Sequence, residues 1–171
     1  MKRRTPPACP IDPPPETPPA GVDPAHLLTY QRARFRTHLP TARRYSPQHF
    51  WISPLEGGVC RVGFTRFATR ILGELVEHEW EVRPGAAVRP GQTLGWVEGF
   101  KTTTDIYGAV AGRFLGGNAD LVRDVGLIAA DPYSRGWLYA VQGTPAPDLL
   151  DVHAYAQQLD AAIDRALGKI M

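Results

Sequence analysis

One lysine, Lys101, is the residue whose type and placement most suggest chemistry. The chain holds 19 Lys plus Arg residues, yet its other lysines are Lys2 and Lys169, near the two ends. Arginine therefore supplies nearly all the positive charge. A guanidinium resists acylation, whereas an ε-ammonium can lose a proton and react as an amine. We predict that Lys101 is present for covalent modification of its amine; a solvated turn lysine is the alternative when the residue is taken alone.

The residues on either side of Lys101 predict a tight turn between two strands. Leu94–Val97 and Asp105–Val110 are rich in apolar, β-branched and aromatic residues, a composition typical of strands. The polar stretch between them makes the turn, where Gly99 permits a backbone conformation that a β-carbon would oppose. A modified lysine belongs on a rigid, protruding turn because other enzymes must reach it.

Several residues stand at characteristic spacings from this lysine. Gly85 lies sixteen residues before it and Gly112 eleven after it, while Glu98 is three before and Asp105 four after. Further downstream are Asn118-Ala119, Asp131-Pro132-Tyr133 and Gly136-Trp137. In these motifs, from about Gln48 to Leu167, the chain resembles lipoyl-carrying domains, and most closely the H proteins of the glycine cleavage system.

The resemblance implies a mainly β fold, a flattened barrel-sandwich hybrid of two quasi-symmetric sheets with short helices and a C-terminal helix. It implies lipoate attached covalently to Lys101, with Glu98, Asp105, Gly85 and Gly112 as the accompanying site residues. It also implies a cytoplasmic, non-catalytic carrier loaded by a lipoate ligase or synthase. Such a carrier shuttles an aminomethyl group among the glycine decarboxylase P protein, the aminomethyltransferase T protein and dihydrolipoyl dehydrogenase.

Two departures from related patterns bear on the cargo. Biotinyl carriers usually place their lysine between two methionines, whereas Phe100 and Thr102 flank Lys101, which disfavours biotin. The His-Glu-Trp of H proteins reads His49-Phe50-Trp51 here, so a carboxylate that favours a cationic amine is replaced by an aromatic ring. An H-like lipoate-binding protein of another pathway, in sulfur oxidation or lipoyl relay, therefore stays open, as does an unlipoylated interaction module.

The chain divides by composition into three parts. Residues 1–24 contain nine prolines and few large apolar side chains, which predicts a disordered tail. Residues 25–48 form a basic extension, in which the alternation along Arg32–Leu39 predicts a strand on the domain surface. For the remaining residues, 49–171, the resemblance implies the lipoyl-carrier domain. The extension has no recognised nucleic-acid motif, so we do not expect nucleic-acid binding.

Residue patterns also predict most elements of the carrier domain. Thr65 is placed to cap a short helix that ends at Gly73, and the last segment has apolar residues at helical spacing with Gly168 as a stop. No apolar run approaches membrane-spanning length, so a soluble protein without membrane partners is expected. Cys60 is predicted to pack as a buried thiol, and the five histidines show no metal-ligand spacing. The expected elements are strands over 50–52, 59–64, 75–82 and 136–142 and helices over 66–72, 118–123 and 152–167.

Overall fold

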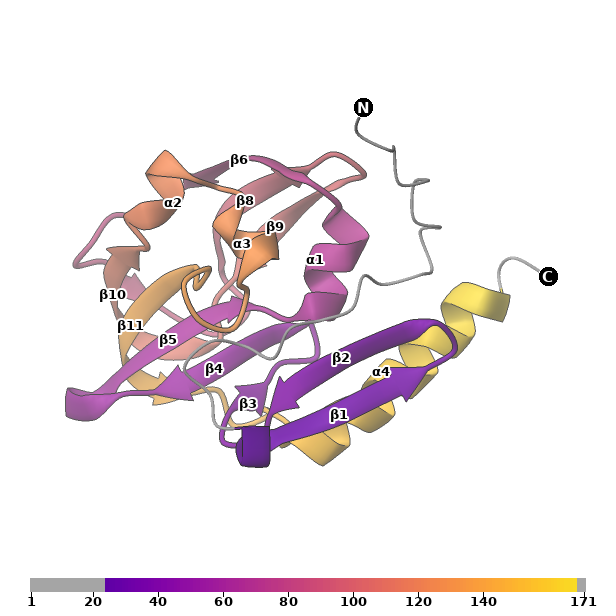
Figure 1. The fold of residues 1–171 in the computed structure, drawn as a ribbon. Coiled ribbons are helices and arrows are strands. Elements are labelled where there is room, and N and C mark those ends of the chain that lie inside the picture. The colour runs from indigo at the N-terminus through magenta and orange to yellow at the C-terminus, as the bar shows by residue number, and fades with distance from the viewer. Residues whose placement is uncertain (1–23, 169–171) are drawn as a thin grey trace.

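The computed structural model describes residues 24–168, so the predicted proline-rich tail lies almost wholly outside the described residues. Figure 1 shows a mainly β molecule that ends in a long helix, which confirms the predicted fold class. The strands are β1 (Leu27–Arg32), β2 (Phe35–Pro40), β3 (Arg44–Tyr45), β4 (Phe50–Pro54), β5 (Val59–Phe64), β6 (Leu75–Trp80), β7 (Ala87–Val88), β8 (Thr93–Gly99), β9 (Thr103–Tyr107), β10 (Val110–Gly117) and β11 (Tyr139–Pro145). The helices are α1 (Arg66–Leu72), α2 (Asp120–Arg123), α3 (Leu127–Ala130) and α4 (Val152–Gly168), with 3-10 turns at Pro24–His26 and Glu56–Gly58.

Two sheets of unequal size enclose the main core. One has the strand order β3-β4-β5-β11-β10-β7, and the other has the order β6-β8-β9. Buried side chains from both sheets belong to one cluster, for example Val62 and Val141 from the first and Leu94 and Ile106 from the second. Non-directional burial of apolar area is the dominant favourable term in folding. The β8–β9 hairpin is thus anchored along its inner face.

A second core lies on the opposite side of β4. Side chains alternate across a strand, so Phe50 points to the main core while Trp51 points to the second. This second cluster includes Tyr155 and Leu159 of α4 and Leu39 of β2. The C-terminal helix is therefore covered by the β1–β2 hairpin, as Figure 1 shows, and its aromatic residue is part of the core as expected.

The prediction of one strand over Arg32–Leu39 is wrong. The chain reverses at Ala33 and Arg34, with Ala33 at φ 52°, and β1 pairs antiparallel with β2. The alternation is real only within β2, where Phe35 is buried and Arg36 is exposed. The turn contains no Gly, Asn or Pro, the residues that usually mark a turn. The alternation of charged and less polar residues therefore continues across it, and the sequence gives no sign of the reversal.

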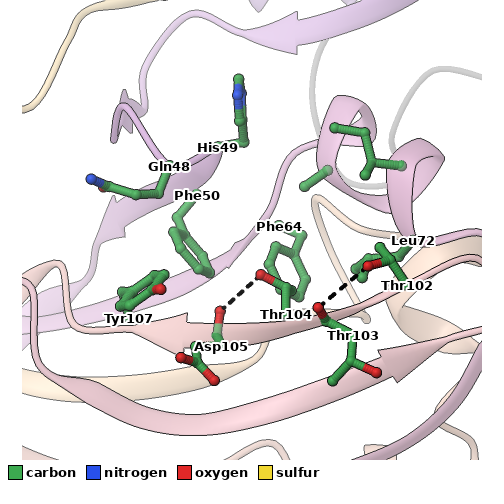
Figure 2. Close-up of a pocket in the computed structure, with 12 residues that line it drawn as sticks. Gln48, His49, Phe50, Phe64, Leu72, Thr102, Thr103, Thr104, Asp105 and Tyr107 are labelled. Carbon is green, nitrogen blue, oxygen red and sulfur yellow. Dashed lines mark hydrogen bonds between the residues drawn. The ribbon is translucent and has the colours of Figure 1, made fainter.

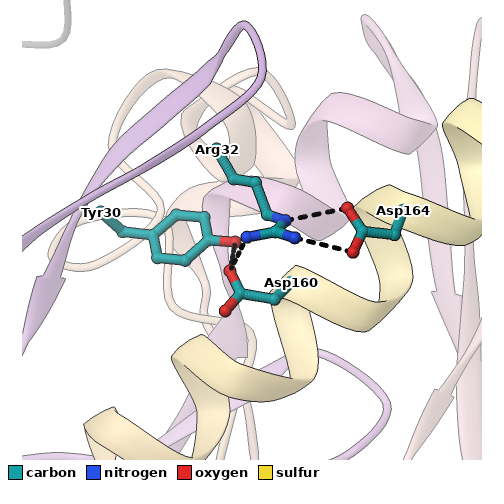
Figure 3. Close-up of polar contacts among 4 residues, drawn as sticks. All are labelled: Tyr30, Arg32, Asp160 and Asp164. Carbon is teal, nitrogen blue, oxygen red and sulfur yellow. Dashed lines mark hydrogen bonds and ion pairs between the residues drawn. The ribbon is translucent and has the colours of Figure 1, made fainter.

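Polar contacts join this hairpin to α4 (Figure 3). The Arg32 guanidinium donates to both carboxylate oxygens of Asp164, at 2.9 and 2.7 Å. The Tyr30 hydroxyl donates to the Asp160 carboxylate at 2.7 Å, and burial together with this partner raises the pKa of Tyr30. The two carboxylates are one helical turn apart, so a single strand end reaches both.

Several element boundaries differ from expectation. The strand predicted over 75–82 ends at Trp80, ahead of the turn at Pro84, and the strand predicted over 136–142 begins at Tyr139. In the second case, the carbonyls of Arg135 and Trp137 accept hydrogen bonds from the Asn118 side-chain amide at 2.8 and 2.9 Å. These two carbonyls accept the hydrogen bonds that the buried Asn118 amide needs, and the strand begins only after them.

The predicted caps of α1 are confirmed. The Thr65 hydroxyl accepts from the Ala68 amide, and the Gly73 amide donates to the Thr69 carbonyl at 3.0 Å. Gly73 has φ 74°, a conformation that favours glycine. Within residues 24–168, no helix is long and apolar enough to cross a membrane.

Candidate functional site

Lys101 lies at the tip of the β8–β9 hairpin, on a turn held from several sides. The Gly99 amide closes the turn on the Thr102 carbonyl at 2.8 Å. The Lys101 amide also donates to the Leu72 carbonyl at 3.0 Å, which ties the tip to the end of α1. A β-carbon at Gly99 would lie 2.2 Å from that Leu72 carbonyl oxygen. Glycine is thus required by close approach to α1, and not by the unusual φ that the sequence suggested.

The Lys101 side chain is exposed and runs past the C-terminal end of α1. Its Nζ lies 3.4 Å from the Arg70 carbonyl oxygen in the last turn of that helix. A β-carbon at Gly73 would come within 3.0 Å of Lys101 Cγ. Gly73 therefore has a second role that its position as a helix stop does not reveal: it leaves room for the lysine stem.

Glu98 and Asp105 share the outer face of the hairpin. Glu98 pairs with Thr103 and Trp96 pairs with Asp105, and directly paired residues point to the same side of a sheet. Figure 2 shows the Asp105 carboxylate directed away from the rings of Phe50 and Phe64. The structure thus brings both predicted carboxylates to the turn, on the face opposite the core.

Gly85 and Gly112 lie away from the lysine, the first just before β7 and the second within β10 of the six-stranded sheet. Gly85 sits in a turn at φ 94°, and its amide donates to the Phe114 carbonyl of β10 at 2.7 Å. A β-carbon at Gly112 would lie 2.1 Å from the Gln142 carbonyl oxygen of β11. In Figure 1 β10 lies on the far side of the molecule from the hairpin tip. Both glycines therefore have backbone roles where they lie, and neither approaches Lys101.

A pocket of about 320 Å³ opens beside the lysine turn, between β4, β5, α1 and β9. Figure 2 shows its side chains, with Thr104 directed toward the rings of Phe50 and Phe64. Asp105 alone is acidic among the described residues that border it. Its walls suit an uncharged, flexible group tethered at Lys101. The lining residues are Gln48, His49, Phe50, Phe64, Ala68, Ile71, Leu72, Thr102, Thr103, Thr104, Asp105 and Tyr107.

Phe50 forms part of both the pocket and the main core. Its side chain is 2% exposed, and its ring stacks on Phe64 with centroids 4.9 Å apart. A carboxylate at this position would have to be buried against a phenyl ring without a partner, which is strongly unfavourable. The aromatic residue that departs from the H-protein motif is therefore integrated into the packing of the pocket wall.

His49 also borders the pocket and was not singled out as a site residue by the sequence. Its backbone is in the left-handed region at φ 72°, which is uncommon for residues other than glycine. The Nδ1 atom lies 2.8 Å from the Tyr155 hydroxyl, which in turn lies 2.7 Å from the Thr65 hydroxyl. Burial, aided by the charge of Arg165, lowers the pKa of His49 to about 4. The imidazole is thus neutral at physiological pH, and it links the pocket wall to α4.

Known proteins with similar sequences and folds share one description. Residues 43–162 match the model of the glycine cleavage H-protein family. The chain is 40% identical over 122 residues to the glycine cleavage system H protein of Corynebacterium jeikeium, a match covering 70% of this chain and 95% of that protein. It is 38% identical over 117 residues to the Streptomyces coelicolor counterpart, covering 68% and 93%.

A solved structure agrees with these sequence matches. The crystal structure of a glycine cleavage system H protein from Mycobacterium marinum matches with a TM-score of 0.64 at 38% identity. The match covers 70% of this chain and 98% of that one. The β1–β2 hairpin precedes the residues that match the family model.

Proposed function

Since the chain belongs to the glycine cleavage H-protein family, we propose that it is a lipoyl carrier of glycine cleavage with Lys101 as its attachment residue. The single observation that carries the assignment of Lys101 is its place at an exposed, rigid hairpin tip beside an apolar pocket. No other lysine lies among residues 24–168. The turn presents the amine to a modifying enzyme, and the pocket lies within reach of an attached arm.

The residues of the site fit a lipoyl group. Acylation removes the charge of the lysine, so the resulting arm is neutral at its amide and apolar along its chain. The ring edges and methyl groups that line the pocket, from Phe50, Phe64 and Ile71, match such an arm. When bound, a lipoyl group supplies a disulfide that accepts the aminomethyl unit and is later regenerated by oxidation.

The contribution of this chain is to hold and present that arm. Backbone hydrogen bonds from Gly99, Phe100 and Lys101 fix the tip, so the attachment point does not drift relative to the body. Tethering raises the effective concentration of the carried group at each partner and keeps it from solvent. The partners in this proposal are the P protein, the T protein and dihydrolipoyl dehydrogenase, in the cytoplasm, with a lipoate ligase or synthase for loading.

Mass spectrometry after incubation with a lipoate ligase, ATP and lipoate tests the attachment. The wild-type chain should gain a single lipoyl group that maps to Lys101, and Lys101→Arg should gain none, because a guanidinium is not acylated. The lipoylated wild type should then support exchange of bicarbonate into glycine by the P protein. An adduct on Lys2 or Lys169, or no adduct under conditions that modify another H protein, contradicts the assignment. Lipoylation without glycine exchange would favour another lipoate-dependent pathway.

A further inference from the structure

Phe100, the residue before Lys101, is the most solvent-exposed large hydrophobic side chain among residues 24–168. Its exposed fraction is 83%, and the other exposed large hydrophobic residues in this range are aliphatic. Phe100 does not border the pocket that adjoins the turn. An exposed phenyl ring forgoes the favourable transfer of its apolar area out of water. Nothing within the described chain relieves that cost.

The backbone that carries Phe100 is fixed. Its amide donates to the Glu74 carbonyl at 2.7 Å, and the amides on either side, those of Gly99 and Lys101, are also hydrogen-bonded. A partner that buries the ring therefore orders little more than the side-chain rotamer. Rigid aromatic side chains of this kind give binding energy at low entropic cost.

The length of the Lys101 side chain indicates which partner enzyme contacts the Phe100 ring. Once the arm is attached, its length separates the reacting sulfurs from the turn, so enzymes acting on the arm can work at a distance from Phe100. During attachment the reacting atom is Lys101 Nζ itself, one side-chain length from the backbone. The neighbouring Cα of Phe100 is about 3.8 Å from that of Lys101, so the attaching enzyme must enclose the turn.

From these observations, and resting on the proposed lipoylation of Lys101, we propose that Phe100 is the anchor by which the lipoyl-attaching enzyme recognises this carrier. The partner is an acyl-transfer enzyme with an apolar recess beside its lysine channel. In its reaction the Lys101 amine bonds to the carbonyl carbon of a lipoyl acyl-adenylate. The bond from that carbon to the phosphate oxygen breaks, AMP leaves, and the amine gives up a proton to solvent. Phe100 takes no part in this bond exchange; it positions the turn.

Steady-state kinetics of lipoate transfer to the full-length apo-protein, with a lipoate ligase, ATP and lipoate, test the proposal. Phe100→Ser should raise the KM for the carrier at least about tenfold, equal to ~1.4 kcal/mol of binding, while kcat stays within about twofold. Phe100→Tyr should restore the wild-type KM because it keeps the ring. Val122→Ser is the matched control: Val122 is 81% exposed on α2, and its loss should leave the KM unchanged.

Two further readouts separate this proposal from the assignment on which it rests. Phe100→Ser that has been fully lipoylated at high enzyme concentration should be reduced by dihydrolipoyl dehydrogenase as fast as the wild type. Equal KM values for Phe100→Ser and the wild type overturn the anchor and leave the lipoyl assignment intact. A similar loss in the dehydrogenase reaction also overturns it, since the ring then serves partners in general. If the wild type is never lipoylated, both the anchor role of Phe100 and the lipoyl assignment of Lys101 are wrong.

Discussion

The imidazole of His49 shows how one residue of the pocket wall is linked to folding. Burial lowers its pKa from 6.5 in the unfolded chain to about 4 in the folded protein. Between these values the unfolded state binds more protons than the folded state, so stability rises with pH across this window. Above about pH 6.5 the titration of His49 does not lower the free energy of unfolding. As the pH falls toward 4, protonation of the unfolded chain lowers the free energy of unfolding by about 3 kcal/mol.

The variant His49→Asn should remove this dependence. Asparagine tolerates the left-handed backbone that His49 adopts and carries no titrating group. We expect the free energy of unfolding in urea, measured at about pH 7 and about pH 4, to fall by about 3 kcal/mol more for the wild type than for the variant. Carboxylates titrate in both proteins and cancel in the difference. Equal falls for the two proteins would show that His49 is protonated without penalty.

At the scale of elements, the β1–β2 hairpin acts as a cover for α4. Its inner side chains, such as Phe35 and Leu39, are buried with those of the helix, and its strand end carries Tyr30 and Arg32 to the helix carboxylates. The exposed Arg32–Asp164 pair is screened by solvent and contributes little. The Tyr30–Asp160 hydrogen bond lies at the edge of the core, so more of its strength is retained.

Removal of the Tyr30 hydroxyl measures this contact. Tyr30→Phe keeps the ring in the second core but leaves the Asp160 carboxylate without that donor, and we expect a loss of about 1 kcal/mol in the free energy of unfolding. Gln31→Ala, an exposed change on the same strand, should alter it by less than about 0.5 kcal/mol. If both variants unfold like the wild type, the hydroxyl contact does not hold the hairpin on α4.

Over the whole molecule, sequence patterns predicted most local features and missed those that depend on residues far apart in the chain. The lysine turn, the caps of α1 and the terminal helix each depend on neighbouring residues, and all three were predictable. The pocket was not, because its walls come from strands and a helix far apart in the chain, and the contact between His49 and Tyr155 leaves no local signal. The spacing of the glycines from Lys101 was visible in the sequence, but their structural role was not. Gly112 is required by the close approach of β10 and β11.

The two cores should unfold as one unit because they share β4. Phe50 and Trp51 are adjacent on this strand and belong to different clusters, so neither core can open without disturbing the other. Leu39 and Leu94 form a matched pair, since both are 0% exposed and lie in different cores. We expect Leu39→Ala and Leu94→Ala each to lower the free energy of unfolding by about 3 kcal/mol.

Both variants should keep a single transition in which tryptophan fluorescence and far-ultraviolet circular dichroism coincide. The tryptophans report on both cores, because Trp51 lies in the second cluster and Trp80 packs against the first. A biphasic curve for Leu39→Ala, with the first phase confined to one signal, would mean that the hairpin and α4 open separately. In that case His49 would lose its contact with Tyr155 of α4, and the lysine turn would keep its shape after α4 had left.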